Sequence, residues 1–105
     1  MLRPLAFALL FAATGVAQTP VDGVASYAAR CAVCHGEDGN GTERAPGIVS
    51  ALPRATDAQL AAIIRHGTES GMPAQDVPDA EMAALIAHLR AMQTRAARRR
   101  AQIFD

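Results

Sequence analysis

Apolar residues recur three and four positions apart in three segments of the chain, and this spacing predicts three amphipathic helices. The segments are Val21 to His35, Thr56 to Gly67, and a third that begins at Pro78 and Asp79. Their apolar positions are, in chain order, Val24, Tyr27, Ala28, Cys31 and Cys34; Leu60, Ile63 and Ile64; and Met82, Leu85, Ile86 and Leu89. No segment alternates apolar and polar residues as a strand would, so the pattern predicts an all-α fold.

Glycine and proline mark the segments between the predicted helices. Gly36 to Gly41 contains three glycines and an Asn-Gly pair, which is typical of a turn. Thr42 to Arg54 and Thr68 to Val77 have no clear helical period, so we predict two loops, the first with room for one helical turn. Thr56 and Gln59 have the spacing of a capping box, which favours a helix start at this point.

The first residues have the pattern of a secretory signal. Arg3 precedes the apolar run Leu5 to Ala13, and Gly15 and Ala17 supply the small residues that a signal peptidase reads. We therefore expect export to the periplasm and cleavage after Ala17. An uncleaved anchor is the alternative, although the run is shorter than the roughly 20 apolar residues that a membrane span needs.

Charge divides the remainder of the chain into two parts. Residues 18–92 carry five arginines against nine acids and form the expected domain, while residues 93–105 carry four arginines against one acid. The acidic domain argues against a nucleic-acid partner, because phosphate binding needs a basic face. We expect 93–105 to be a basic helical extension or tail. Its arginines, from Arg95 to Arg100, could dock an acidic partner or an anionic surface, or simply form a solvated helix end.

The domain is short of large apolar side chains. Once the signal is removed, the aromatic residues are Tyr27 and Phe104, and there is no tryptophan. A chain of this size forms only a marginal hydrophobic core by itself. We therefore expect a large apolar cofactor to complete the core.

Cys31-Ala32-Val33-Cys34-His35 is the C-x-x-C-H motif of covalent haem attachment. Thiols three positions apart lie on one face of a helix, so both can reach the vinyl groups of one haem, and His35 can then bind the iron. A thiol–disulfide enzyme would need a βαβ pattern, which the sequence lacks. A zinc site would need four ligands, and no second Cys/His pair is present.

The sequence resembles the class I c-type cytochromes over Val21 to about Met92. The resemblance rests on the motif with its glycines (Cys31, Cys34, His35, Gly36, Gly39, Gly41), on Pro46, on the Gly71-Met72-Pro73 segment, and on the final helix around Leu85 to Leu89. It implies that residues 18–92 are a cytochrome c domain, in which three main helices enclose one covalently bound haem c and the first and last helices cross. It also implies a one-electron carrier without enzymatic activity of its own, acting between redox partner proteins.

The resemblance makes Met72 the second axial ligand of the iron, opposite His35. Met72 stands in a Gly/Pro loop and belongs to no apolar stripe, whereas Met82 and Met92 have the spacing of core residues. His66, at a helix end, is the next candidate, and His88 follows it. Thioether ligation favours ferrous iron and raises the reduction potential, which suits electron transfer.

Two further positions carry expectations from the family. Pro46 should accept a hydrogen bond from the imidazole of His35 through its carbonyl, although a proline here could simply shape the loop. His88 departs from the family, which usually has an aromatic residue that packs on the first helix; Tyr27 and Gly23 are the matching partners here. His88 should pack there less well or remain partly exposed.

We interpret the chain as a periplasmic one-electron carrier with no catalytic residues. Two alternatives stay open on the sequence alone. A haem enzyme or gas sensor would have an open sixth position at the iron, and a dedicated subunit of a dehydrogenase or oxidase complex would have the same chemistry with a fixed partner. The sequence names neither the electron donor nor the acceptor.

Overall fold

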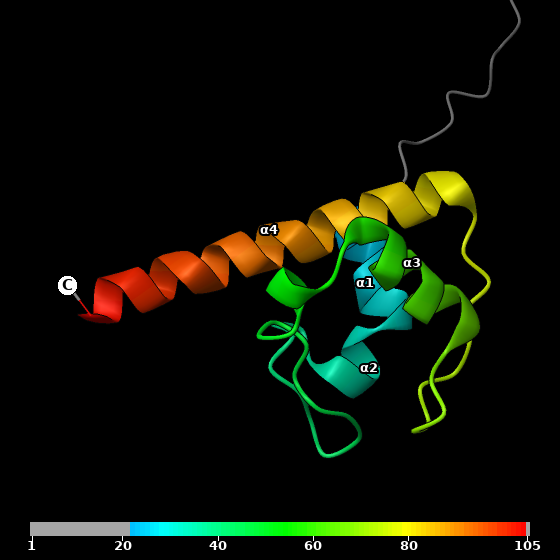
Figure 1. The fold of residues 1–105 in the computed structure, drawn as a ribbon, viewed down its shortest axis with the longest axis horizontal. Helices are drawn as coiled ribbons and strands as arrows, with labels where there is room; N and C mark the ends of the chain where they lie inside the picture. Colours follow the sequence, from blue (N-terminus) through cyan, green and yellow to red (C-terminus); the bar gives the residue numbers. More distant parts are fainter. Residues whose placement is uncertain (1–21, 105) are drawn as a thin grey trace, which may run out of the picture.

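The computed structural model describes residues 22–104 of the chain. The expected signal peptide, 1–17, and its cleavage after Ala17 lie outside these residues. Five helical elements follow one another: α1 (Gly23–Arg30), α2 (Ala32–His35), the 3-10 turn η1 (Leu52–Arg54), α3 (Asp57–His66) and α4 (Asp79–Phe104). α1 crosses α4, with α2 and two loops below the crossing and α3 beside it (Figure 1). The predicted all-α cytochrome c fold is confirmed.

The crossing of α1 and α4 is close because α1 begins with a glycine. A Cβ atom on Gly23 would lie 2.1 Å from the carbonyl oxygen of Ala84, a distance that no side chain tolerates. One turn further along, Tyr27 is buried beside the apolar face of α4 and is 2 % exposed. Leu85 on α4 is fully buried in the same core. The contact between α1 and α4 therefore forms part of the apolar core of the described residues.

The first predicted helix is divided in two and presents a different face from the one expected. The N–H of Cys31 donates to the carbonyl of Tyr27 and ends α1, and α2 starts at the next residue. Val24 is 60 % exposed, whereas Ser26 is buried and donates to Glu81 at 2.9 Å. The prediction of a buried Val24 was wrong because a carboxylate on α4 binds the polar side of α1.

The same carboxylate also forms an ion pair with Arg30 at the end of α1. The guanidinium and hydroxyl beside Glu81 hold the pKa of its carboxyl below its usual range. Two polar side chains of α1 therefore stay near α4 with their hydrogen bonds satisfied, at positions that an apolar pattern assigns to solvent.

α3 begins and ends at the residues that the sequence indicates. Thr56 and Gln59 form the predicted capping box, and Gly67 closes the helix with a positive φ of 71°. Ile64 is buried and Leu60 is partly buried against the core, but Ile63 is 41 % exposed. The predicted stripe is therefore correct at two of its three positions.

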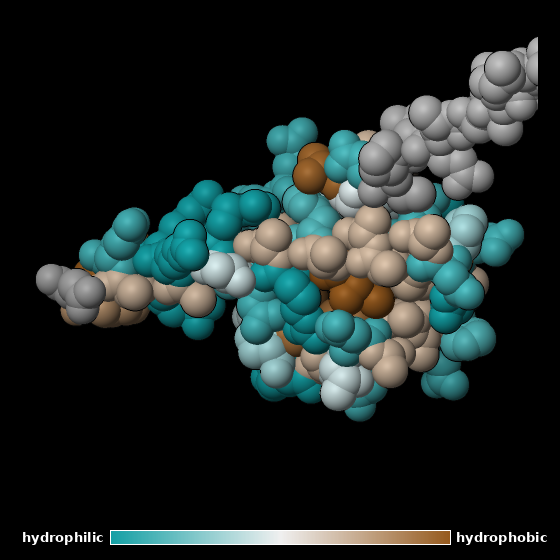
Figure 2. Space-filling view, turned by 90° about the horizontal axis from the view of Figure 1, so that it is seen from above, coloured by the Kyte–Doolittle hydropathy of each residue, from teal (hydrophilic) through white to brown (hydrophobic). Residues whose placement is uncertain are grey.

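α4 buries the predicted stripe and then continues beyond the domain. Its buried residues are Met82, Leu85, Ile86, Leu89 and Met92. Arg90 fixes the helix to the preceding segments, because its guanidinium donates to the carbonyls of Leu52 and Ala55, both at 2.7 Å, and pairs with Asp57. From Gln93 to Phe104 the helix projects from the body of the domain, and hydrophilic side chains dominate this end (Figures 1 and 2).

None of the helices in residues 22–104 combines the length and the apolar character that crossing a membrane requires.

His88 occupies the position at the crossing where the family usually has an aromatic residue. Its ring lies 5.3 Å from the ring of Tyr27 at an interplanar angle of 54°, and its Cβ is close to Gly23. Partial burial lowers the pKa of His88, and Arg95 adds to the effect, while Asp22 opposes it. The expected packing against Tyr27 and Gly23 is confirmed, and His88 remains partly exposed.

The crossing should not tolerate a side chain at its closest point. We expect Gly23→Ala to lower the free energy of unfolding of the protein by about 1–3 kcal/mol or more, because the backbones must separate. Guanidinium denaturation followed by circular dichroism measures this. Val24→Ala, at the exposed neighbouring position, should change the value by less than about 0.5 kcal/mol. Equal effects of the two changes would contradict the close crossing.

His88 should make the stability depend on pH. Because the pKa of His88 is lower in the folded protein than its ordinary value of about 6.5, the unfolded chain binds the proton more tightly. The contribution of the neutral ring to the free energy of unfolding is complete above about pH 6.5. It is lost as the pH falls through the lower pKa of the folded state. His88→Phe should remove this decline, so unfolding curves of the two proteins should diverge increasingly below pH 6.5. A parallel decline in both would contradict the assignment.

Candidate haem site

α2 is a single helical turn that carries the attachment motif. The N–H groups of Cys34 and His35 donate to the carbonyl of Cys31 at 3.2 and 2.9 Å, so the two sulfurs and the imidazole come from a single helical turn. Cys31 is buried at the start of α2, and Cys34 is partly exposed. Neither forms a disulfide among the described residues. Burial raises the pKa of the Cys31 thiol, and the neighbouring Arg30 partly offsets this.

The chain then turns back beneath α2 and is held to it by several hydrogen bonds. The N–H of Gly41 donates to the carbonyl of His35 at 2.8 Å, and the Thr42 hydroxyl donates to the carbonyl of Cys34 at 2.6 Å. Tyr27 reaches from α1 and donates its hydroxyl to the carbonyl of Gly36 at 2.6 Å. Burial, with smaller contributions from Cys31 and Asp38, raises the pKa of Tyr27 to about 12, so this donor keeps its proton.

Pro46 lies where the returning loop passes the imidazole. Gly41 and Pro46 form an antiparallel bridge, and the carbonyl oxygen of Pro46 is 2.9 Å from Nδ1 of His35. A carbonyl can only accept, so this hydrogen bond requires the proton on Nδ1 and leaves the lone pair on Nε2. A neutral imidazole with a free Nε2 is a metal ligand, and the hydrogen bond on its other nitrogen fixes the orientation of the ring.

Met72 is held by a closed loop after α3. The Thr68 N–H donates to the Met72 carbonyl at 3.0 Å, and the Met72 N–H donates to the Thr68 hydroxyl at 3.2 Å. A Cβ on Gly67 would lie 2.4 Å from the Met72 carbonyl oxygen, so the close backbone approach in this loop occurs at Gly67. Gly71 has open space around it and a φ of 124°, so the backbone angle calls for glycine there.

One cavity brings these elements together. Its volume is about 500 Å³, within the range of cofactor sites. The residues that line it come from the motif, the returning loop and the Met72 loop: Cys34, His35, Arg44, Ala45, Pro46, Thr68, Ser70, Gly71, Met72 and Pro73. His35 and Met72, thirty-seven positions apart in the sequence, therefore lie on a common space.

The residues of this cavity fit a haem. They provide a thiol for covalent attachment, an imidazole nitrogen and a thioether sulfur as iron ligands, and several apolar side chains between them. Arg44 at the cavity is a cation that could pair with a propionate. Elsewhere in residues 22–104, no three His, Cys, Asp or Glu side chains gather in a way that could hold a metal ion.

The other candidate ligands lie away from the cavity. His66 is exposed at the end of α3, and His88 packs on Tyr27 at the helix crossing. Met82 and Met92 are both 3 % exposed in the apolar core, as their helical spacing predicted. Of the residues considered as axial ligands, His35 and Met72 are the ones that line the cavity.

The sequence reading did not identify Thr42 and Thr68 as supports of the site. Each places its hydroxyl on the backbone of a site residue, Cys34 and Met72 respectively. Short hydroxyl side chains in turns often form hydrogen bonds with nearby backbone groups, and this tendency was the available signal for the role of the two threonines. It could not show which backbone group each would reach.

Comparison with known proteins agrees with this geometry. The family described as cytochrome C oxidase, cbb3-type, subunit III matches residues 18–89, which is more than half of the chain. No curated protein and no solved structure gave a match. With the helical fold and the cavity that combines the attachment motif with Met72, the match identifies the chain as a member of this c-type cytochrome family, a haem-binding electron-transfer cytochrome with covalently bound haem c.

Proposed function

We propose that the chain is a periplasmic one-electron carrier whose single haem is attached through Cys31 and Cys34, with His35 and Met72 as the axial ligands. The observation that carries the proposal is the cavity that both His35 and Met72 line. The haem, when bound, supplies an iron that cycles between the ferric and ferrous states. Export rests on the signal pattern of residues 1–17.

The protein's own residues hold the two ligands in fixed positions. The Pro46 carbonyl keeps the proton of His35 on Nδ1, and the Thr68 hydroxyl fixes the backbone of Met72. Electron transfer gains from this arrangement because the ligands need to move little when the iron changes its charge. A soft thioether ligand also favours the ferrous state and raises the potential.

With both His35 and Met72 as ligands, the iron would have no position left for a substrate, which supports an electron carrier over an enzyme. The competing function, a haem enzyme or gas sensor, requires that Met72 stay away from the iron. The loop argues against this, because hydrogen bonds in both directions between Met72 and Thr68 hold Met72 beside the cavity.

A second candidate function is a dedicated electron-transfer subunit of an oxidase complex. The observation in its favour is the description of the matching family, which names a subunit of a cytochrome oxidase. The chemistry at the iron would be the same, and the difference lies in whether the partner is fixed.

Covalent attachment is the first test. The haem should stay with the polypeptide through acid–acetone extraction and on a denaturing gel. Intact mass should equal the cleaved chain from Gln18 plus one haem. Changing both Cys31 and Cys34 to Ala should release the haem on extraction. A wild-type haem that washes out would exclude attachment at these cysteines, and a mass that includes residues 1–17 would contradict cleavage after Ala17.

Met72 is tested by changing the ligand. Met72→His should lower the reduction potential, because nitrogen stabilises ferric iron better than sulfur; axial ligands help set potentials over roughly 0.8 V among haem proteins. Met72→Ala should open the sixth position and let the ferrous protein bind carbon monoxide rapidly. Both variants should lose the far-red absorption band of sulfur bound to ferric haem.

Met82→Leu is the matched control for the assignment of this sulfur. Met82 is a buried thioether outside the cavity, and its change to leucine conserves volume. The substitution should cost less than about 1.5 kcal/mol of stability and leave the band intact. Loss of the band in Met82→Leu but not in Met72→Ala would mean that the wrong sulfur is assigned. If the wild type lacks the band near neutral pH, His66 becomes the next ligand to test.

A further inference from the structure

The projecting end of α4 and the loop after the attachment motif enclose a second hollowed surface. Two adjoining hollows of about 250 and 500 Å³ make up this surface, which we call the α4 groove. The hollows share Asn40, Val49, Ala96 and Arg99. Among the described residues, none lines both the α4 groove and the haem cavity. A partner in the groove would therefore leave the haem cavity free.

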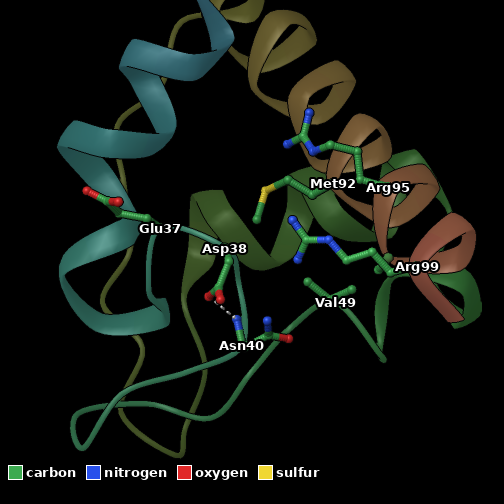
Figure 3. Close-up of a pocket in the computed structure, with 8 residues that line it drawn as sticks. Glu37, Asp38, Asn40, Val49, Met92, Arg95 and Arg99 are labelled. Atoms are coloured by element: carbon green, nitrogen blue, oxygen red, sulfur yellow. Dashed lines mark hydrogen bonds between the residues drawn. The ribbon is translucent and has the colours of Figure 1, made fainter. Parts of the chain in front are cut away.

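The groove has an apolar floor and a basic wall. Val49, Met92 and Ala96 form the floor, and Arg95, Arg99 and Arg100 stand along α4. Figure 3 shows the Arg99 side chain extending from α4 across the hollow, between Met92 and the loop that carries Asp38. Ile103, which is 75 % exposed, lines the outer end of the groove.

The arginines of this wall form no direct ion pair or side-chain hydrogen bond among residues 22–104. The described ion pairs involve Arg30, Arg65 and Arg90, and no described side-chain hydrogen bond involves Arg95 or any arginine from 98 to 100. Asp38 on the opposite wall accepts from the backbone N–H of Asn40 at 3.0 Å. Hydrogen bonding to Asn40 lowers the pKa of the Asp38 carboxyl, and the nearby charge of Arg99 adds to this effect. The basic wall is therefore available to a negatively charged molecule from outside.

We propose that the α4 groove docks an acidic polypeptide segment of a partner protein, with apolar side chains on the floor and carboxylates on the arginines. This rests on the proposed function as an electron carrier and deepens it. The partner would be held at the groove while the haem cavity stays accessible for electron exchange.

A polypeptide fits the groove better than an anionic membrane does. A membrane presents a flat layer of phosphates, whereas Arg99 is directed across a hollow. Glu37 and Asp38 line the same hollow, and their carboxylates would meet the phosphates of a closely apposed bilayer. A single polypeptide segment covers less of this surface than a bilayer does, so it can place its carboxylates on the arginines of α4 and its apolar side chains on the floor.

The test uses the haem-containing protein in its ferrous state and a synthetic helical peptide of about 15 residues, with glutamates on one face and leucines on the other. At low salt, amide chemical shifts should change at Val49 and Ala96 in the groove and not at Gly71 beside the haem cavity. Binding should weaken as salt rises, because exposed charges are screened. Shifts confined to the haem cavity, or no binding at all, would overturn the proposal.

Arg99→Glu and Arg98→Glu form a matched pair. Both reverse one charge on the exposed end of α4, but Arg99 lines the groove and Arg98 does not. Arg99→Glu should weaken peptide binding by about tenfold, because a carboxylate would then face the peptide's own, and Arg98→Glu should weaken it by less than about threefold. Equal weakening would mean attraction by diffuse charge and would overturn the groove as a site.

Further measurements distinguish other occupants and the underlying function. Binding to vesicles that contain phosphatidylglycerol without binding to the peptide would overturn the proposal in favour of a membrane. Self-association lost in Arg99→Glu, without peptide binding, would do so in favour of a second copy. Reversible reduction of the haem and absence of carbon monoxide binding test the electron-carrier function separately. If these hold and the peptide fails, docking alone is wrong.

Discussion

The contact between α1 and α4 at Gly23 is the constraint on which the haem site depends. Because this crossing is close, Tyr27, one turn along α1, is buried and donates its hydroxyl to the carbonyl of Gly36. Gly36 directly follows His35, so the position of α2 depends on the packing of α1 against α4. The imidazole is thus oriented from two sides, by the helix crossing through Gly36 and by Pro46 through its carbonyl.

The Met72 loop, which forms the other side of the site, is held in place by hydrogen bonds within the loop. Met72 lies on no helix, and its backbone is paired with Thr68 in both directions while Gly67 allows the close approach. Met72 also packs against the apolar core, which is small in a domain with few aromatic residues. Hydrogen bonds within the loop, and one from Gln75 to the carbonyl of Ile64, hold it against α3.

The sequence predicted most of the helices because their signals are local. The capping box at Thr56, the end of α3 at Gly67 and the buried stripe of α4 all depend on residues within a few positions of one another. The division of the first helix at Cys31 and the exposed Val24 could not be predicted in this way. The buried polar side of α1 depends on Glu81, about fifty positions away, which binds Ser26 and Arg30. The C-x-x-C-H motif identified Cys31, Cys34 and His35. The hydrogen bonds of the Thr42 and Thr68 hydroxyls to the backbone of site residues could be found only in the three-dimensional structure.

The length of α4 determines where the basic end of the sequence lies in the structure. The sequence shows an acidic domain followed by a basic extension, and the helix carries the extension beyond the body of the domain. Had the helix ended at Met92, these arginines could have folded back onto the acidic body and formed ion pairs there. A continuous helix keeps Arg98 and Arg100 away from most of those acids and leaves the arginines of the groove without described ion pairs. The continuous helix therefore leaves the arginines along its end free to contact other molecules. None of these arginines lines the haem cavity.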